Sequence, residues 1–254
     1  MCMIFDSHAH YNDERYESCQ KESIQYAVDS GVVGIINCGT DIFSSQQSID
    51  LSEKYPFFYA AVGYHPESIN DSTVFDEAAL EKLIANKKVI AVGEIGLDYY
   101  YETTYKSKQL EFFEKQILLA KKHSLPVIIH DRDAHMDTLD LIKKHKPNGV
   151  LHCFSGSIEM AKEVINIGMY IGIGGVITFK NSKKLVDVVK HIPLERILLE
   201  TDAPYMSPEP YRGKINNSAY IKYVAEKIAE IKNIPIYEVY NTTVNNVKTL
   251  FNVE

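Results

Sequence analysis

Short apolar runs rich in β-branched residues recur along the chain, and segments with a helical pattern lie between them. The run from Val33 to Gly39 is typical, because its length and composition predict a buried strand. Apolar residues between two later runs are spaced to form one face of a helix. They are Leu110, Phe113, Ile117 and Ala120. In all we expect eight strands, at about residues 3–8, 33–39, 57–63, 89–95, 126–130, 149–153, 169–174 and 197–202.

Strands and helices alternate throughout the 254 residues of the sequence. A second helical stripe runs from Ile221 to Ile231, and residues 236–251 have the pattern of one more helix. This alternation predicts an α/β fold, a (β/α)8 or TIM barrel, formed as a single domain of residues 1–254. The alternative is a doubly wound open sheet. An open sheet that binds nucleotides usually carries a glycine-rich turn, and neither G-x-G-x-x-G nor G-x-x-x-x-G-K-[ST] occurs.

Metal-binding side chains stand where six of the expected strands end, and that is where barrels carry their chemistry. These residues are His8, His10, His65, Glu94, His130, His152 and Asp202. Because side chains alternate along a strand, His8 and His10 should point the same way, with only Ala9 between them. Neutral imidazole is a good ligand for divalent transition metals. The sequence therefore predicts a metal centre at the mouth of the barrel.

The number of candidate ligands favours two ions. Even with His65 set aside, four imidazoles and two carboxylates remain, whereas a catalytic zinc typically has three protein ligands and one open position. We expect two divalent ions, zinc, magnesium or manganese, with Glu94 as the bridging carboxylate. Such a pair holds a shared hydroxide and suits the in-line displacement of phosphoester hydrolysis. Acyl hydrolysis stays open, because the pair equally polarises a carbonyl, and so does a non-enzymatic role as a metal store or structural staple.

Longer motifs surround these positions in order along the chain. They are Phe5-Asp6-Ser7-His8-Ala9-His10, Gly63-Tyr64-His65-Pro66, Gly93-Glu94-Ile95-Gly96-Leu97-Asp98, Pro126-Val127-Ile128-Ile129-His130, His152-Cys153-Phe154-Ser155-Gly156, Glu200-Thr201-Asp202-Ala203-Pro204-Tyr205 and Arg212-Gly213-Lys214. On these motifs the chain resembles the TatD-type metal-dependent DNases, within the wider amidohydrolase-like barrels.

This resemblance implies hydrolysis of phosphodiester bonds in DNA and assigns ligands to two metals. The ligands implied for one metal are His8, His10, Glu94 and Asp202, and those for the other are Glu94, His130 and His152. The family usually has Asn-Glu-Pro after its Arg-Gly-Lys-x stretch, whereas this chain has Asn216-Asn217-Ser218. This departure leaves open the role of the missing Glu, which is either a local cap or a substrate contact.

Basic residues follow the seventh and eighth expected strands, where barrels often bind phosphate. We expect Lys180, Arg212 and Lys214 to bind phosphates beside the scissile bond. Lys183 and Lys184 either join them or lie in water at the start of a helix.

Catalytic and positioning roles are expected for five side chains. Asp202 should take the proton from the metal-bound water as well as bind metal, and Tyr205 should stack on a base. We assign His65 to the scissile phosphate or the leaving oxygen, with a role as a hydrogen-bond donor to the ligands as the alternative. On an idealised strand Glu200 and Asp6 share the inward faces of Asp202 and His8, so either should orient ligands.

The formal net charge of −7 argues against binding nucleic acid through bulk electrostatics, so contact with DNA should be local. We expect a cytoplasmic monomer or weak oligomer that acts on single-stranded DNA ends, with no membrane span and no signal peptide. The alternative substrate is the ester bond of D-aminoacyl-tRNA, hydrolysed at the same binuclear site. The four cysteines, Cys2, Cys19, Cys38 and Cys153, lack C-x-x-C spacing and should be reduced, mostly buried apolar groups.

Overall fold

All strands of the described residues are parallel and form one eight-stranded sheet in chain order, from β1 to β8. The computed structural model describes residues 3–101 and 103–253. The strands are β1 (Ile4–Ala9), β2 (Val32–Cys38), β3 (Phe58–Val62), β4 (Val89–Asp98), β5 (Val127–Arg132), β6 (Gly149–Leu151), β7 (Tyr170–Ile173) and β8 (Ile197–Leu199). Each overlaps one of the eight expected ranges. The predicted (β/α)8 barrel is therefore confirmed.

The barrel closes between β8 and β1. An isolated bridge pairs Ala9 with Ala203, and the backbone N–H of Asp202 donates to the carbonyl of His8 over 2.9 Å. The hydroxyl of Ser7 also donates to the carbonyl of Leu199. The two edge strands of the sheet thus meet beside the candidate metal ligands His8 and Asp202.

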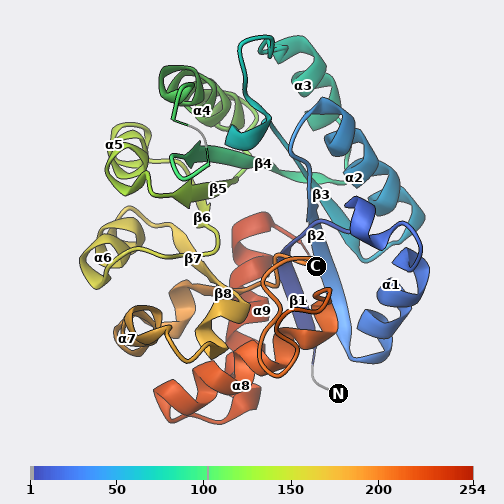
Figure 1. The fold of residues 1–254 in the computed structure, drawn as a ribbon, viewed down its shortest axis with the longest axis vertical. Coiled ribbons are helices and arrows are strands. Elements are labelled where there is room, and N and C mark those ends of the chain that lie inside the picture. Colours follow the sequence, from blue (N-terminus) through green and yellow to red (C-terminus); the bar gives the residue numbers. More distant parts are fainter. Residues whose placement is uncertain (1–2, 102, 254) are drawn as a thin grey trace.

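Helices surround the barrel, as Figure 1 shows. The α-helices of the described chain are α1 (Gln20–Asp29), α2 (Ile42–Lys54), α3 (Glu77–Ile84), α4 (Lys106–Lys122), α5 (His135–His145), α6 (Ile158–Asn166), α7 (Lys183–His191), α8 (Ile221–Lys232) and α9 (Ile236–Phe251). Short 3-10 helices are η1 (Glu14–Tyr16), η2 (Pro66–Ser68), η3 (Gly175–Thr178), η4 (Leu194–Arg196) and η5 (Ser218–Tyr220). The predicted helical stripes fall within α4 and α8, and the last expected helix is α9.

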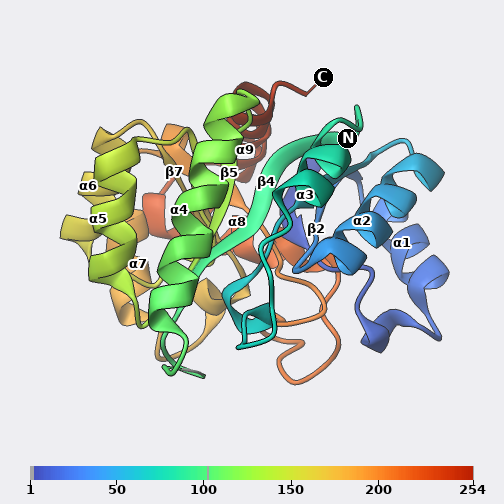
Figure 2. The same cartoon turned by 90° about the horizontal axis from the view of Figure 1, so that it is seen from above.

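The last helix closes one end of the barrel. Residues of α9 pack against side chains that point into the barrel, such as Phe5, Ile36 and Leu198. The α9 residues are Val244, Val247, Leu250 and Phe251. Figure 2 shows α9 on the side of the molecule opposite the loops that follow β3 and β8. A second cluster of buried apolar residues lies between the strands and the outer helices. The opposite end of the barrel, where the strands have their C-termini, is not covered by α9 and holds the buried polar side chains described below.

Irregular pairing in β1 changes which side chains point inward. Phe5 belongs to the inner cluster, whereas Ala9 belongs to the outer one. In a regular strand, residues 5 and 9 would share a face. The register with β2 shifts between Asp6 and Ala9, where one extra residue is accommodated. This bulge turns His8 and His10 inward together.

The same bulge corrects the expectation for Asp6, which does not share the inward face of His8. Its carboxylate instead accepts hydrogen bonds from the hydroxyls of Thr201 and Ser218, each over 2.5 Å. It therefore links β1 to the segment that follows β8.

No helix in the described part of the chain has the length and apolar character that crossing a membrane requires. Cys19, Cys38 and Cys153 are free thiols, whereas Cys2 lies outside the described residues. Cys38 is fully buried, and the other two are partly buried.

The packing of α9 predicts a large cost for Leu250→Ala. Leu250 is 4% exposed against the inner strands. Its truncation should lower the free energy of unfolding by about 2–5 kcal/mol, because it leaves a cavity beneath the barrel. Tyr237→Ala is the matched control, since Tyr237 is 61% exposed on the same helix. Urea denaturation followed by circular dichroism measures both, and equal losses would contradict the role of α9 as the floor of the barrel.

Candidate metal centre

The structure brings all seven candidate side chains together at the C-terminal end of the barrel. His8 and His10 come from β1, Glu94 from β4 and His130 from β5. His152 directly follows β6, and His65 and Asp202 stand three residues after the ends of β3 and β8. Potential ligand atoms of these residues form three overlapping groups, each with all atoms within 4.8 Å of one another.

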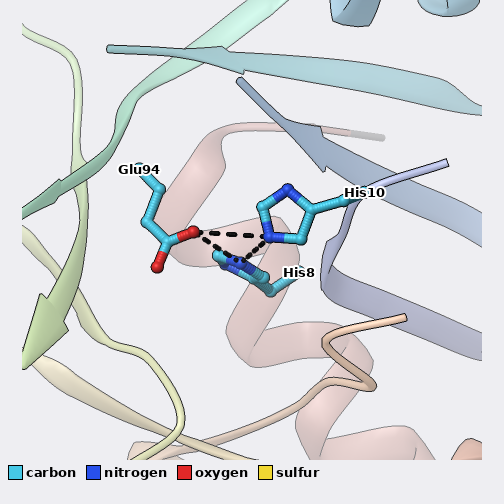
Figure 3. Close-up of side chains that lie close together, drawn as sticks. All are labelled: His8, His10 and Glu94. Carbon is cyan, nitrogen blue, oxygen red and sulfur yellow. Dashed lines mark hydrogen bonds and ion pairs between the residues drawn. The ribbon is translucent and has the colours of Figure 1, made fainter. Parts of the chain in front are cut away.

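Glu94 lies between two sets of imidazoles. One of its oxygens points toward the rings of His8 and His10 (Figure 3). This oxygen, Oε2, is 3.2 Å from Nε2 of His8 and 3.4 Å from Nε2 of His10. Its Oε1 faces three other rings, at 2.8 Å from His152 Nε2, 3.0 Å from His130 Nδ1 and 3.3 Å from His65 Nε2. Each oxygen of one carboxylate therefore faces its own set of nitrogen donors.

Asp202 lies beside the first set. Its Oδ1 is 3.5 Å from Nε2 of His10 and 3.7 Å from Nε2 of His8. The Asp202 side chain is 18% exposed, whereas that of Glu94 is 4% exposed. Asp202 is thus the carboxylate of the pair that is more open to solvent.

Hydrogen bonds behind the rings set which nitrogen faces the centre with a lone pair. Nδ1 of His10 donates to the carbonyl of Cys38 over 2.9 Å, so its Nε2 is free to bind a cation. Nε2 of His130 lies 3.0 Å from Oδ2 of Asp98, which leaves its Nδ1 toward Glu94. Nδ1 of His8 lies 3.4 Å from the thiol of Cys38.

The donor set fits divalent cations. Both ring nitrogens of buried His152 lack a hydrogen-bond partner in the described structure, although Nε2 lies close to Glu94. Nε2 of His8 and Nε2 of His10 lie only 3.0 Å apart, a spacing that a shared cation would stabilise. Within residues 3–101 and 103–253, no lysine or arginine forms an ion pair with Glu94 or Asp202. Buried carboxylates need compensating charge, and cations held among these imidazoles would supply it.

The protonation states agree with this donor set. Burial would raise the pKa of Glu94, but the surrounding imidazoles, first that of His152, hold it well below its usual range. Burial and the nearby His152 lower the pKa of His8 to about 4. Burial lowers the pKa of His10 too, but the Asp202 and Glu94 carboxylates outweigh it and raise that pKa to about 10. A bound cation would take the place of this proton and neutralise the same carboxylates.

His65 faces the centre differently from the other imidazoles. Its Nδ1 accepts a hydrogen bond from the backbone N–H of Glu67 over 3.2 Å. The neutral ring therefore carries its proton on Nε2, the atom that points to Glu94. This arrangement favours a hydrogen-bond donor over a metal ligand, although His65 belongs to one of the three close groups, with Glu94 and His130.

Two buried residues behind the ligands were missed by the sequence reasoning. Asp98 accepts from His130, and Cys38 contacts His8 through its thiol and His10 through its carbonyl. A signal for Asp98 exists in the sequence, because it stands four residues after Glu94 and so on the same face of β4. Nothing in the sequence distinguished Cys38 from a buried apolar residue.

Glu200 occupies the inward position that the idealised strand predicts. Its Oε1 accepts from the backbone N–H of Cys153 over 2.5 Å and lies 3.7 Å from Nδ1 of His152. A Cβ on Gly172 would come within 2.2 Å of Glu200, so a glycine on β7 is required to make room for this carboxylate. Burial raises the pKa of Glu200 to about 7.

The segment Asn216-Asn217-Ser218 anchors the loop after β8. The side chain of Asn217 accepts from the N–H of Ala219 over 2.9 Å and caps η5. Ser218 donates to Asp6, and Asn216 donates to the carbonyl of Thr201. This chain thus forms a local cap without the Glu that the family usually has there.

The expected substrate-binding residues lie in the loops after β7 and β8. Lys180, Arg212 and Lys214 are exposed, and the Arg212 guanidinium lies 4.3 Å from the ring centre of Phe179. The Tyr205 ring lies edge-on to His10, with centres 6.2 Å apart, and its hydroxyl donates to Asp13.

The two remaining lysines begin α7. Nζ of Lys184 donates to the carbonyl of Ser155 over 3.0 Å, and Lys183 is exposed. This position agrees with the interpretation that they lie in water at a helix start.

Comparison with known proteins identifies the family. Residues 5–252 match the family described as TatD related DNase. The chain belongs to the TatD family of metal-dependent hydrolases. It is 43% identical to a Bacillus subtilis protein named uncharacterized metal-dependent hydrolase YabD, over 99% of this chain and 100% of that protein. The crystal structure of YjjV, a TatD homologue from Escherichia coli, superposes with a TM-score of 0.92 at 34% identity, covering 100% of this chain and 99% of that one. A TatD family hydrolase from Entamoeba histolytica has a TM-score of 0.85 at 26% identity, covering 98% of this chain and 97% of that one.

The position of Glu94 predicts that Glu94→Ala loses bound metal. Removing the shared carboxylate should leave less than half of the native metal content and lower hydrolytic activity by about a hundredfold or more, because both sets of imidazoles lose their common partner. Elemental analysis of the purified protein measures the metal, and circular dichroism checks the fold. Glu230→Ala, on the exposed side of α8, is the control. Two metals and undiminished activity in Glu94→Ala would refute the shared role of Glu94.

Proposed function

We propose that this protein hydrolyses phosphodiester bonds of DNA, from single-stranded ends, with two divalent cations held about Glu94. The observation that carries the proposal is the division of the Glu94 oxygens between two sets of imidazoles. His8, His10, Glu94 and Asp202 would hold one cation, and Glu94, His130 and His152 the other. When bound, such a pair activates water and stabilises the attacking and leaving oxygens of an in-line displacement.

Asp202 is proposed to accept the proton of the attacking water. It is the more exposed of the two central carboxylates, so a proton taken there can pass to solvent. Its Oδ1 stays within 3.5 Å of His10, which holds the carboxylate in place. A positioned carboxylate of this kind serves as a general base.

His65 is proposed to donate its Nε2 proton to a nonbridging or leaving oxygen of the phosphate. The bond from Glu67 to Nδ1 fixes this proton on the nitrogen that faces the centre. Charge-assisted hydrogen bonds to phosphate oxygen strengthen as negative charge develops in the transition state.

Lys180, Arg212 and Lys214 are proposed to bind phosphates next to the scissile bond. In the described chain none of the three forms an ion pair with a carboxylate, so their charges are available to a ligand. This local attraction would offset the net charge of −7, which repels DNA as a whole. Tyr205, beside His10, would stack on a base.

The test compares substrates on one preparation that has been freed of metal by a chelator and then reloaded with zinc, magnesium or manganese. End-labelled single-stranded DNA should be shortened stepwise from one end, and a matched duplex should be cut more slowly. D-aminoacyl-tRNA is offered in parallel. Loss of the aminoacyl ester with intact DNA would overturn the proposal in favour of ester hydrolysis, and stabilisation by metal without any cleavage would favour a structural staple.

Asp202→Asn should separate metal binding from proton transfer. The amide oxygen can still face His8 and His10, so we expect most of the metal to stay. The amide cannot accept the proton, so kcat on single-stranded DNA should fall by about a hundredfold or more. Asp187→Asn, on the exposed side of α7, is the control. Metal content and kcat are measured on the same samples, and a kcat within a few fold of the native value would exclude the assigned role.

A further inference from the structure

Two exposed tyrosines and an arginine gather where β4 and β5 end. Tyr100 and Tyr101 follow β4 and are 57% and 63% exposed. Their rings are perpendicular, with centres 4.8 Å apart. The guanidinium of Arg132, the last residue of β5, lies 4.2 Å from the ring centre of Tyr100 and 5.1 Å from that of Tyr101. Large aromatic faces held open to solvent by a cation are unusual for a protein surface without a binding role.

These tyrosines are tied to the metal centre through one carboxylate. Oδ1 of Asp98 accepts from the backbone N–H of Tyr100 over 2.9 Å and from that of Tyr101 over 3.1 Å. Oδ2 of the same buried carboxylate lies 3.0 Å from Nε2 of His130. A candidate ligand and the aromatic pair are therefore held in register by opposite sides of Asp98.

Arg132 points toward the mouth of the barrel. It stands two residues after His130 on β5 and pairs in register with Asp98. Alternation along the strand puts its side chain on the inward face, above that of His130. Among the described residues, no carboxylate forms an ion pair with Arg132. Its charge is thus available to a phosphate as well as to the rings.

The preceding residue, Tyr99, has a structural role that Tyr100 and Tyr101 lack among the described residues. The hydroxyl of Tyr99 donates to Asp137 over 2.7 Å, and its ring is partly buried. For Tyr100 and Tyr101, the described residues offer only ring contacts and the backbone bonds to Asp98. Within residues 3–101 and 103–253, the ring contacts of this pair are with Arg132 and with each other.

We propose that Tyr100, Tyr101 and Arg132 form a platform on which a base of the single-stranded substrate stacks, next to the phosphate that is cleaved. The proposal rests on the proposed function and adds a second stacking site, on the opposite side of the mouth from the loop after β8. Stacking on an aromatic face does not depend on base identity, so the platform suits an enzyme that removes successive nucleotides. Arg132 would contact the adjoining phosphate while it packs on the rings.

The test is the double variant Tyr100→Ala/Tyr101→Ala, with Tyr100→Phe/Tyr101→Phe and Tyr237→Ala as matched controls. Each is assayed on a single-stranded oligonucleotide and on one whose terminal nucleotides are abasic. The alanine variant should lose about tenfold or more in kcat/KM on the normal strand, mainly through KM, because one stacked base is lost. On the abasic strand it should stay within about twofold of the native enzyme. The phenylalanine variant should keep its activity on both, since stacking needs only the ring.

Two results would overturn the platform. One is an equal loss on normal and abasic strands, which would indicate general damage to the centre. The other is no loss on either. A binding assay tests the platform separately from cleavage. Fluorescence anisotropy measures how tightly the native protein and the alanine variant bind a labelled single-stranded oligothymidylate. If the native protein binds this strand more tightly than the variant but cleaves no DNA, the platform stands and the proposed function fails.

Discussion

The carboxylate of Glu94 is the group on which the centre depends. It is buried within β4, and its two oxygens contact five imidazoles within 3.4 Å. A buried carboxylate is stable only when positive charge or hydrogen-bond donors surround it. Here the surrounding groups are imidazoles on or shortly after four other strands, and they keep Glu94 ionised. The proposed use of this carboxylate as a bridge follows from its position between the two sets.

Irregular strand pairing at β1 and β4 helps to position this cluster. The register of β1 with β2 shifts next to His8, and that of β4 with β5 shifts between Val92 and Ile95, beside Glu94. Each shift re-aims a side chain without moving the strand out of the sheet. The apolar end of the barrel, sealed by α9, supports the polar end, because a well-packed core keeps the strands from moving relative to one another.

Charge in this protein is arranged locally. The protein as a whole is negative, with a net charge of −7. Basic side chains nevertheless lie at strand ends and in loops around the mouth of the barrel, namely Arg132, Lys180, Arg212 and Lys214. Asp98 links the metal centre to the loop after β4. One of its oxygens contacts His130, and the other accepts hydrogen bonds from the backbone of the exposed tyrosines. A single buried side chain thereby fixes the exposed tyrosines relative to His130, a candidate metal ligand.

The sequence by itself determined the number, order and approximate limits of the strands, because a buried strand needs a short apolar run wherever it lies. It also determined which residues end the strands, and hence six proposed ligands and His65, since alternating β and α elements place all strand ends on one side. Only the tertiary structure decided that the Glu94 oxygens divide the imidazoles, that Asp6 turns to Thr201 and Ser218, and that Asp98 and Cys38 lie behind the ligands. The reason is physical: the period of two along a strand is local, whereas a bulge arises from pairing with the neighbouring strand, which no single stretch of sequence records.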